Sequence, residues 1–289
     1  MTLLSQVSAD LHAHSRRSDG TEAPAGLVAA AREAGVDVVA ITDHDTIEGW
    51  AEAREAAQAI GMGLVPGIEV STRQFGFSVH ILCYLPNPDF APLFAELDRV
   101  RESRLTRAKR TVERINEDFP LPWDEVMAKA PEGATIGRPH IADALIDRGY
   151  ANDRGEAFER ILRLDRGYVA SYYAPDPHDA IRLIREAGGV PVLAHPAANP
   201  QGRTPSRQVL ADLRDAGLFG VELNHPENFQ NGIDRLTPIV QDLGLAITGG
   251  GDWHGTGKVN RIGDGRTSGE VLERLLAEAT GTDWVPPQR

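Results

Sequence analysis

The feature of this chain that most constrains its fold is a repeated unit, in which a short apolar run adjoins a cluster of His, Asp or Glu. Such runs occupy residues 7–9, 36–41, 63–65, 81–84, 190–194, 218–223 and 245–248. Helical patterns lie between several of them, and strands that alternate with helices form a parallel sheet. The C-terminal ends of these strands meet at one face. We therefore predict an α/β fold, a closed β/α barrel whose polar clusters form a single site.

The helical patterns cover residues 24–34, 47–60, 177–187 and 206–216, and a glycine follows each of them, as at many helix ends. Residues 99–168 differ, because they read as short helices with no clear strand and carry 14 basic and 13 acidic residues. We expect them to form a small helical insertion that covers the active site of a barrel made of residues 1–98 and 169–289.

The start of this insertion is rich in arginine. Leu97, Val100 and Leu105 belong to its apolar stripe, and four arginines lie largely on other faces of the same helix, namely Arg101, Arg104, Arg107 and Arg110. Two interpretations remain open at this point. The arginines form either a solvated surface or a basic face that attracts a polyanionic substrate.

The chain as a whole is acidic, with a formal net charge of −12, 41% hydrophobic residues and the single cysteine Cys83. This apolar fraction supports a large core. Residues 1–10 lack the pattern of a signal peptide, and no stretch reaches the roughly 20 apolar residues of a membrane helix. We therefore expect a cytoplasmic protein that does not bind membranes and does not coat long nucleic acids. A monomer is consistent with the sequence.

Five histidines adjoin the predicted strand ends, together with three carboxylates: His12, His14, His44, His195, His254, Asp19, Glu69 and Asp252. Imidazole and carboxylate without thiolate is a ligand set typical of hydrolytic Zn, Mn or Fe sites. His80 differs from the others because it opens its apolar run. If that strand follows Glu69 as a hairpin, its first residue returns to the same rim. The glycines at 249–251 would let the backbone approach the site closely.

Six segments of the chain resemble the PHP (polymerase and histidinol phosphatase) phosphoesterase superfamily. They are Asp10-Leu11-His12-Ala13-His14, Ser18-Asp19-Gly20, Thr42-Asp43-His44-Asp45, Pro66-Gly67-Ile68-Glu69, Ala194-His195-Pro196 and Asp252-Trp253-His254. The insertion, with Gly137-Arg138-Pro139-His140, is similar to the subgroup of 3′,5′-nucleotide bisphosphate phosphatases and 5′→3′ exoribonucleases related to RNase AM. The resemblance implies a distorted (β/α)7 barrel that binds two to three divalent ions of Mn, Zn or Fe.

The resemblance also implies which residues hold each ion. The first set is His12, His14, Glu69 and Asp252; the second is Glu69, His80 and His195, with Glu69 bridging; the third is Asp19, His44 and His254. We place Asp19 and His225 among the catalytic residues, with His225 a candidate for the general acid. Arg138 and His140 are expected to bind substrate phosphate, whereas the other interpretation is a surface arginine and a helix-start histidine. Arg16, Arg17, Lys258 and Arg261 are further phosphate candidates or free surface charges.

These features favour a metal-dependent phosphoesterase that acts on small nucleotides, with the 3′-phosphate of a nucleoside 3′,5′-bisphosphate such as pAp as its target. A 5′→3′ exoribonuclease activity on short 5′-phosphorylated RNA, held by residues 101–114, is a second expectation. Three alternatives stay open, namely a histidinol-phosphate phosphatase, a metal-dependent amidohydrolase and a non-catalytic PHP module that binds metal or nucleotide. The amidohydrolase is disfavoured because no lysine follows a predicted strand.

Overall fold

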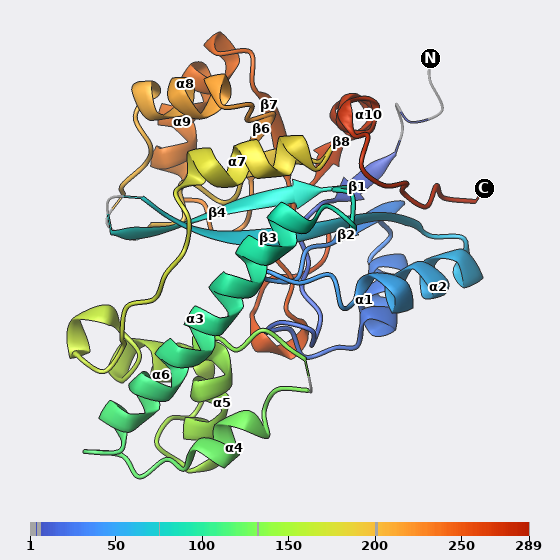
Figure 1. The fold of residues 1–289 in the computed structure, drawn as a ribbon. Coiled ribbons are helices and arrows are strands. Elements are labelled where there is room, and N and C mark those ends of the chain that lie inside the picture. The colour runs from blue at the N-terminus through green and yellow to red at the C-terminus, as the bar shows by residue number, and fades with distance from the viewer. Residues whose placement is uncertain (1–3, 5–6, 75, 132, 200–201, 289) are drawn as a thin grey trace.

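Eight strands in the described part of the chain form one sheet that curls into a nearly closed barrel (Figure 1). The computed structural model describes Leu4 and residues 7–74, 76–131, 133–199 and 202–288. The strands are β1 (Ser8–Asp10), β2 (Val38–Ile41), β3 (Gly63–Gln74), β4 (Phe77–Tyr84), β5 (Val190–Leu193), β6 (Gly220–Asn224), β7 (Ala246–Gly249) and β8 (Thr267–Ser268), in the order β7-β6-β5-β4-β3-β2-β1-β8. The predicted barrel is confirmed, although the two-residue strand β8 was not predicted.

The strand directions explain how distant segments reach one face. β1, β2 and β3 run parallel, as do β5, β6 and β7, whereas β4 is antiparallel to both of its neighbours. The predicted hairpin is thus present, but two details were wrong. β3 continues to Gln74, so Glu69 lies inside it, and β4 begins at Phe77, so His80 lies within that strand rather than at its start.

Both faces of the sheet are buried, because the inner face packs within the barrel and the outer face packs under helices. Side chains that alternate along each strand point to these two faces in turn. Val38 and Ala40 belong to the apolar cluster inside the barrel, whereas Val39 and Ile41 belong to the cluster under the outer helices. These helices are α1 (Pro24–Glu33), α2 (Trp50–Ile60), α7 (Pro177–Glu186), α8 (Arg207–Asp215), α9 (Gln230–Asp242) and α10 (Gly269–Glu278). The four helices predicted from the sequence are all present.

The helical part lies to one side of the barrel, and α3 connects the two (Figure 1). It contains α3 (Ala91–Ile115), α4 (Trp123–Met127), α5 (Arg138–Asp147), α6 (Arg154–Arg160) and the 3₁₀ turn η1 (Leu164–Arg166). Side chains from Ala108 to Leu162 form a separate apolar core there. The predicted boundary at residue 99 falls inside α3, so this helix belongs to both parts, and the division into barrel and insertion stays a prediction.

None of the helices in the described residues is long and apolar enough to span a membrane. Most of the first six residues, where the sequence shows no signal-peptide pattern, lie outside the described part of the chain.

Candidate active site

The predicted ligands come together at one end of the barrel. His12 and His14 follow β1, His44 follows β2, His195 follows β5, His225 follows β6, and Asp252 and His254 follow β7, while Glu69 and His80 come from β3 and β4. Residues separated by up to 242 positions in the chain therefore surround one volume. Parallel strands and one reversed hairpin produce this convergence, as the chain pattern predicted.

Glu69 lies at the centre of this site. Its Oε1 is 2.7 Å from His80 Nδ1 and 3.0 Å from His195 Nε2. Its Oε2 is 3.1 Å from His14 Nε2, 3.2 Å from His44 Nδ1 and 3.4 Å from His12 Nε2. One carboxylate thus faces five imidazoles, which is the arrangement expected of a group that bridges two ions.

Asp252 and Asp19 lie on either side of the same histidines. Asp252 Oδ1 is 3.4 Å from His12 Nε2 and 3.3 Å from His14 Nε2. Asp19 Oδ1 is 3.2 Å from His254 Nε2, and its Oδ2 is 3.7 Å from His44 Nε2. Each of the three predicted ligand sets is therefore brought together, while the binding of an ion to each set stays a prediction.

The donor atoms of this site fit cations better than they fit one another. Glu222 accepts a hydrogen bond from His12 Nδ1 at 3.1 Å, and the Nε2 atoms of His12 and His14, two ligand nitrogens, lie 3.1 Å apart. Four other buried atoms lie 2.7–3.4 Å from an oppositely charged or ionisable neighbour without making a well-aligned hydrogen bond to any described residue: Asp19 Oδ1, His44 Nδ1, His80 Nδ1 and His225 Nε2. Buried polar atoms without a hydrogen bond are rare, and metal binding is one of the few roles that explain a group of them. We call the side chains of the three ligand sets the histidine–carboxylate site, namely His12, His14, Asp19, His44, Glu69, His80, His195, Asp252 and His254.

The electrostatics of the site point the same way. Burial opposes charge on His14, but hydrogen bonds to Asp252 and Glu69 outweigh it and raise the pKa of His14 to about 9. Burial likewise opposes the ionised form of Glu69, yet His44, His80 and His12 hold its pKa well below the usual range. The carboxylates therefore stay ionised at neutral pH and can bind divalent cations, which would displace the proton from His14.

The backbone is shaped around these ligands. A Cβ on Gly250 would lie 2.3 Å from His12 Cβ, so only glycine lets this loop approach the site, as the sequence predicted. His195 and Asp252 adopt positive φ angles of 27° and 51°, which are unusual for residues with a side chain. Strained backbone of this kind concentrates at functional sites.

Two supporting carboxylates were missed in the sequence. Glu222 is fully buried, hydrogen-bonds His12, and accepts from the backbone N–H of His195 at 3.0 Å. Asp43 accepts from Ser15 N, Ser15 Oγ and Ser18 Oγ at 2.7–2.8 Å, and so fixes the loop that carries Asp19. A signal was available for Glu222, because it is the one charged residue in the apolar run 218–223.

His225 and Lys258 both contact Asp252. His225 Nδ1 accepts from Glu227 N at 3.1 Å, so its neutral ring carries the proton on Nε2, 3.4 Å from Asp252 Oδ2. Lys258 Nζ is 2.6 Å from Asp252 Oδ2 and 3.1 Å from Glu227 Oε1, and these pairs raise its pKa although burial opposes the charge. Lys258 is therefore not the free surface charge that one interpretation expected.

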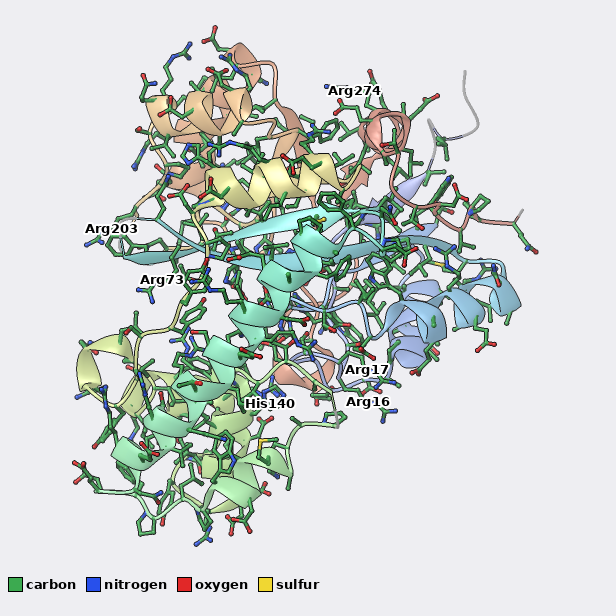
Figure 2. The ribbon with its side chains drawn as sticks, in the orientation of Figure 1. Arg16, Arg17, Arg73, His140, Arg203 and Arg274 are labelled. Atoms are coloured by element: carbon green, nitrogen blue, oxygen red, sulfur yellow. The ribbon has the colours of Figure 1, made fainter. Side chains whose placement is uncertain are left out.

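Arg138 and His140 begin helix α5, on the insertion side of the site. His140 Nδ1 accepts from Gly137 N at 3.1 Å, which fits the helix-start interpretation. Its ring also lines a cavity of about 250 Å³ with Arg16, Lys129 and Arg154, and Figure 2 shows His140 and Arg16 at the edge of the barrel that faces the helical part. Arg138 lies over the Phe158 ring, with its guanidinium carbon 5.2 Å from the ring centroid. Contact of Arg138 and His140 with substrate stays a prediction.

The solvated-surface interpretation of the basic helix was wrong for two of its arginines. Arg104 and Arg107 are only 6% and 8% exposed, whereas Arg110 is exposed. Arg104 Nη1 is 3.0 Å from Asp45 Oδ2 and 2.6 Å from Ser71 Oγ. The prediction failed because α3 packs between the barrel and α5, which places a polar helix face in the interior.

Comparison with known proteins agrees with this geometry. Residues 10–120 match the PHP domain family. The chain is 32% identical to a 3′,5′-nucleoside bisphosphate phosphatase of Chromobacterium violaceum, over 87% of this chain and 89% of that protein. It is 31% identical to a 5′-3′ exoribonuclease of Haemophilus influenzae, over 85% and 89%. It is 32% identical to a phosphoribosyl 1,2-cyclic phosphate 1,2-diphosphodiesterase of Eggerthella lenta, over 88% and 97%.

A solved structure from Bifidobacterium adolescentis, described as that of a metal-dependent phosphoesterase, superposes with a TM-score of 0.91. The match has 39% identity and covers 95% of this chain and 97% of that one. The barrel and the site thus define a metal-dependent phosphoesterase, a hydrolase of phosphate esters. The chain belongs to the PHP family.

Proposed function

We propose that the protein hydrolyses the 3′-phosphate of nucleoside 3′,5′-bisphosphates such as pAp, using two to three Mn, Zn or Fe ions. The observation that carries this proposal is that Arg104 of the insertion pairs with Asp45, the residue after His44, and so brings a basic side chain to the histidine–carboxylate site. Arg138 and His140 of the same insertion are the proposed phosphate contacts. Similarity to the bisphosphate phosphatase supports it. We also propose that the insertion, residues 99–168, covers this site and that the protein acts in the cytoplasm.

Divalent ions held by the three ligand sets would lower the pKa of a water molecule towards neutrality and neutralise the phosphate oxygens. The chain's own residues would orient these groups. Glu222 fixes the His12 ring so that Nε2 faces the site, and Asp43 fixes the loop of Asp19. His225 Nε2–H lies 3.4 Å from Asp252 Oδ2 without a well-aligned hydrogen bond, and it can donate a hydrogen bond that stabilises the departing ribose oxygen.

A panel of phosphate-release assays tests this proposal. Adenosine 3′,5′-bisphosphate, histidinol phosphate, a ribosyl 1,2-cyclic phosphate and a simple aryl phosphate are each offered with Mn, Zn or Fe. We expect the highest kcat/KM for the bisphosphate, with adenosine 5′-monophosphate as the product. A preference for histidinol phosphate would support that alternative, and the absence of all turnover would support a non-catalytic module.

Exoribonuclease activity is the second candidate, because the exoribonuclease relative matches over a similar length. Short 5′-phosphorylated RNA should be shortened from its 5′ end and release nucleoside 5′-monophosphates. Steady turnover of a dinucleotide without cleavage of longer RNA would rule out this activity while leaving the phosphatase proposal intact.

A further inference from the structure

Arg154, which belongs to the helical part, reaches the end of the barrel where the predicted metal ligands gather. Its Nη1 donates a hydrogen bond to the backbone oxygen of Asp19 at 3.1 Å. Its Nε and Nη2 donate to Oδ1 and Oδ2 of Asp143, each at 2.7 Å. The guanidinium group therefore joins α5, which carries Asp143, to the loop that carries Asp19.

The place of Arg154 is fixed from within the helical part. It is the first residue of α6, and the side chain of Asp153 caps this helix by accepting from Glu156 N at 2.8 Å. The side chain of Arg154 is only 15% exposed, and its two-point pair with Asp143 fixes the plane of the guanidinium group. Nη1 is thus directed at the barrel rather than free to turn into solvent.

Arg154 also lies against the 3₁₀ turn η2 (Gly255–Gly257), which follows His254 directly. A Cβ on Gly257 would lie 2.2 Å from Arg154 Nη1, so the absence of a side chain at this position makes room for the guanidinium group. The nitrogen that donates to Asp19 is therefore also close to the loop of His254.

The loops of Asp19 and His254 are joined to each other at Thr21. The N–H of Thr21 donates to His254 O at 3.1 Å, and its Oγ1 accepts from Thr256 N at 3.0 Å. The side chains of Asp19 and His254 approach to 3.2 Å, between Oδ1 and Nε2. Their positions thus depend on one small region of backbone, which Thr21 holds from the barrel and Arg154 holds from the helical part.

We propose that Arg154 is a positioning residue, which holds the loops of Asp19 and His254 so that the third ligand set can bind its ion. This inference rests on the proposed function in that it assumes an ion held by Asp19, His44 and His254. Groups that orient the ligands of a metal without touching it typically change its affinity about 10- to 100-fold when they are removed. Ion binding in the barrel would then depend on where the helical part lies, because Arg154 comes from α6 and is anchored on α5.

Reloading the full chain with Mn²⁺ tests this inference without a substrate. Equilibrium dialysis followed by elemental analysis gives the number of ions per chain and their affinities for wild type, Arg154→Met, His254→Asn and the double variant. We expect wild type to bind one ion more than His254→Asn, and Arg154→Met to bind that ion about 10- to 100-fold more weakly. The double variant should bind no fewer ions than His254→Asn, because both changes act on the same ion.

Arg160→Met is the matched control, since Arg160 is an exposed arginine of the same helix and pairs with Glu156 rather than with the barrel. It should bind Mn²⁺ like wild type, and circular dichroism verifies the fold of each variant. If Arg154→Met does not fold, Asp143→Asn takes its place, because it keeps the arginine but weakens its anchor on α5. Weaker binding of the same ion is expected there.

Equal ion number and affinity in wild type and in the folded variant would overturn the positioning role. A further loss of ions in the double variant would overturn it as well, because the effect would then lie at another ligand set. Equal binding by wild type and His254→Asn would also do so, since there would be no third ion to position. If reloaded wild type hydrolyses no phosphate ester, the proposed function fails instead, and the binding data still decide the role of Arg154.

Discussion

The histidine–carboxylate site and the four-arginine cluster, which consists of Arg73, Arg104, Arg107 and Arg138, are neighbours with opposite charge. The first gathers Asp19, Glu69 and Asp252 with histidine rings, and the second gathers four guanidinium groups with one carboxylate, that of Asp45. The first is suited to cations and the second to an anion. The difference shows that this end of the barrel is built to be completed by ligands, and a phosphate ester next to divalent ions fits both regions.

The largest expected effect is the loss of the central carboxylate. Glu69→Gln removes the charge that faces five histidines, so we expect phosphatase activity to fall to background and metal content, measured by elemental analysis, to fall with it. Glu55→Gln, an exposed glutamate on α2, is the control and should keep both. Full turnover by Glu69→Gln would contradict the role of this carboxylate in holding the metal ions needed for hydrolysis.

The next largest effect is expected on stability, from removing the carboxylate that pairs with Arg104 of the four-arginine cluster. Asp45→Asn removes the one carboxylate of Arg104 and should lower the free energy of unfolding by about 3–5 kcal/mol, as expected when a buried pair loses one partner. Urea denaturation measures this change. Asp98→Asn, which removes an exposed carboxylate that pairs with Arg101, is the control and should change little. Equal, small effects in both variants would mean that Arg104 does not depend on Asp45.

A smaller effect, on metal affinity, is expected when Glu222, which hydrogen-bonds His12, loses its charge. Glu222→Gln keeps the shape of the side chain but weakens the hold on His12 Nδ1, so metal affinity should fall about 10- to 100-fold. Competition with a chelator gives this affinity, and circular dichroism verifies the fold. Unchanged affinity in a folded variant would make Glu222 a purely structural residue.

The mildest test uses pH. In chelated protein, the raised pKa of His14 means that its charged form stabilises the fold fully below about pH 6.5, and that this stability is lost as pH rises through about 9. The free energy of unfolding should therefore fall across this window by at most about 3 kcal/mol, and His14→Asn should flatten the slope. A slope that persists in His14→Asn would assign it to other groups.

The sequence predicted which residues gather at the histidine–carboxylate site because these residues adjoin strands. A strand end has a defined place in a barrel, so His12, His195 and Asp252 could be brought together without knowledge of side-chain packing. His80 was placed less well, since the start of β4 depends on the hairpin that joins it to β3.

The sequence named Arg138 and the arginines of α3 as candidates to bind phosphate or a polyanion, but the grouping of the four arginines could not be predicted in the same way. Its residues come from a strand and two helices that are distant in sequence, and the arginines of α3 have the spacing of an ordinary solvated helix face. Their burial follows from how α3 packs between the barrel and α5, which helical periodicity does not encode. Glu222 was partly predictable. Its charge within an apolar run was visible in the sequence, but its hydrogen bond to His12 was not.

A crystal structure of the metal-loaded protein with adenosine 5′-monophosphate and inorganic phosphate would test the central claim most directly. The account predicts divalent ions among Glu69, Asp252 and the histidines, with inorganic phosphate against them, and the 5′-phosphate against Arg138 and His140. Ions in place but a 5′-phosphate held away from both residues would contradict the claim that the barrel and the insertion act on one substrate.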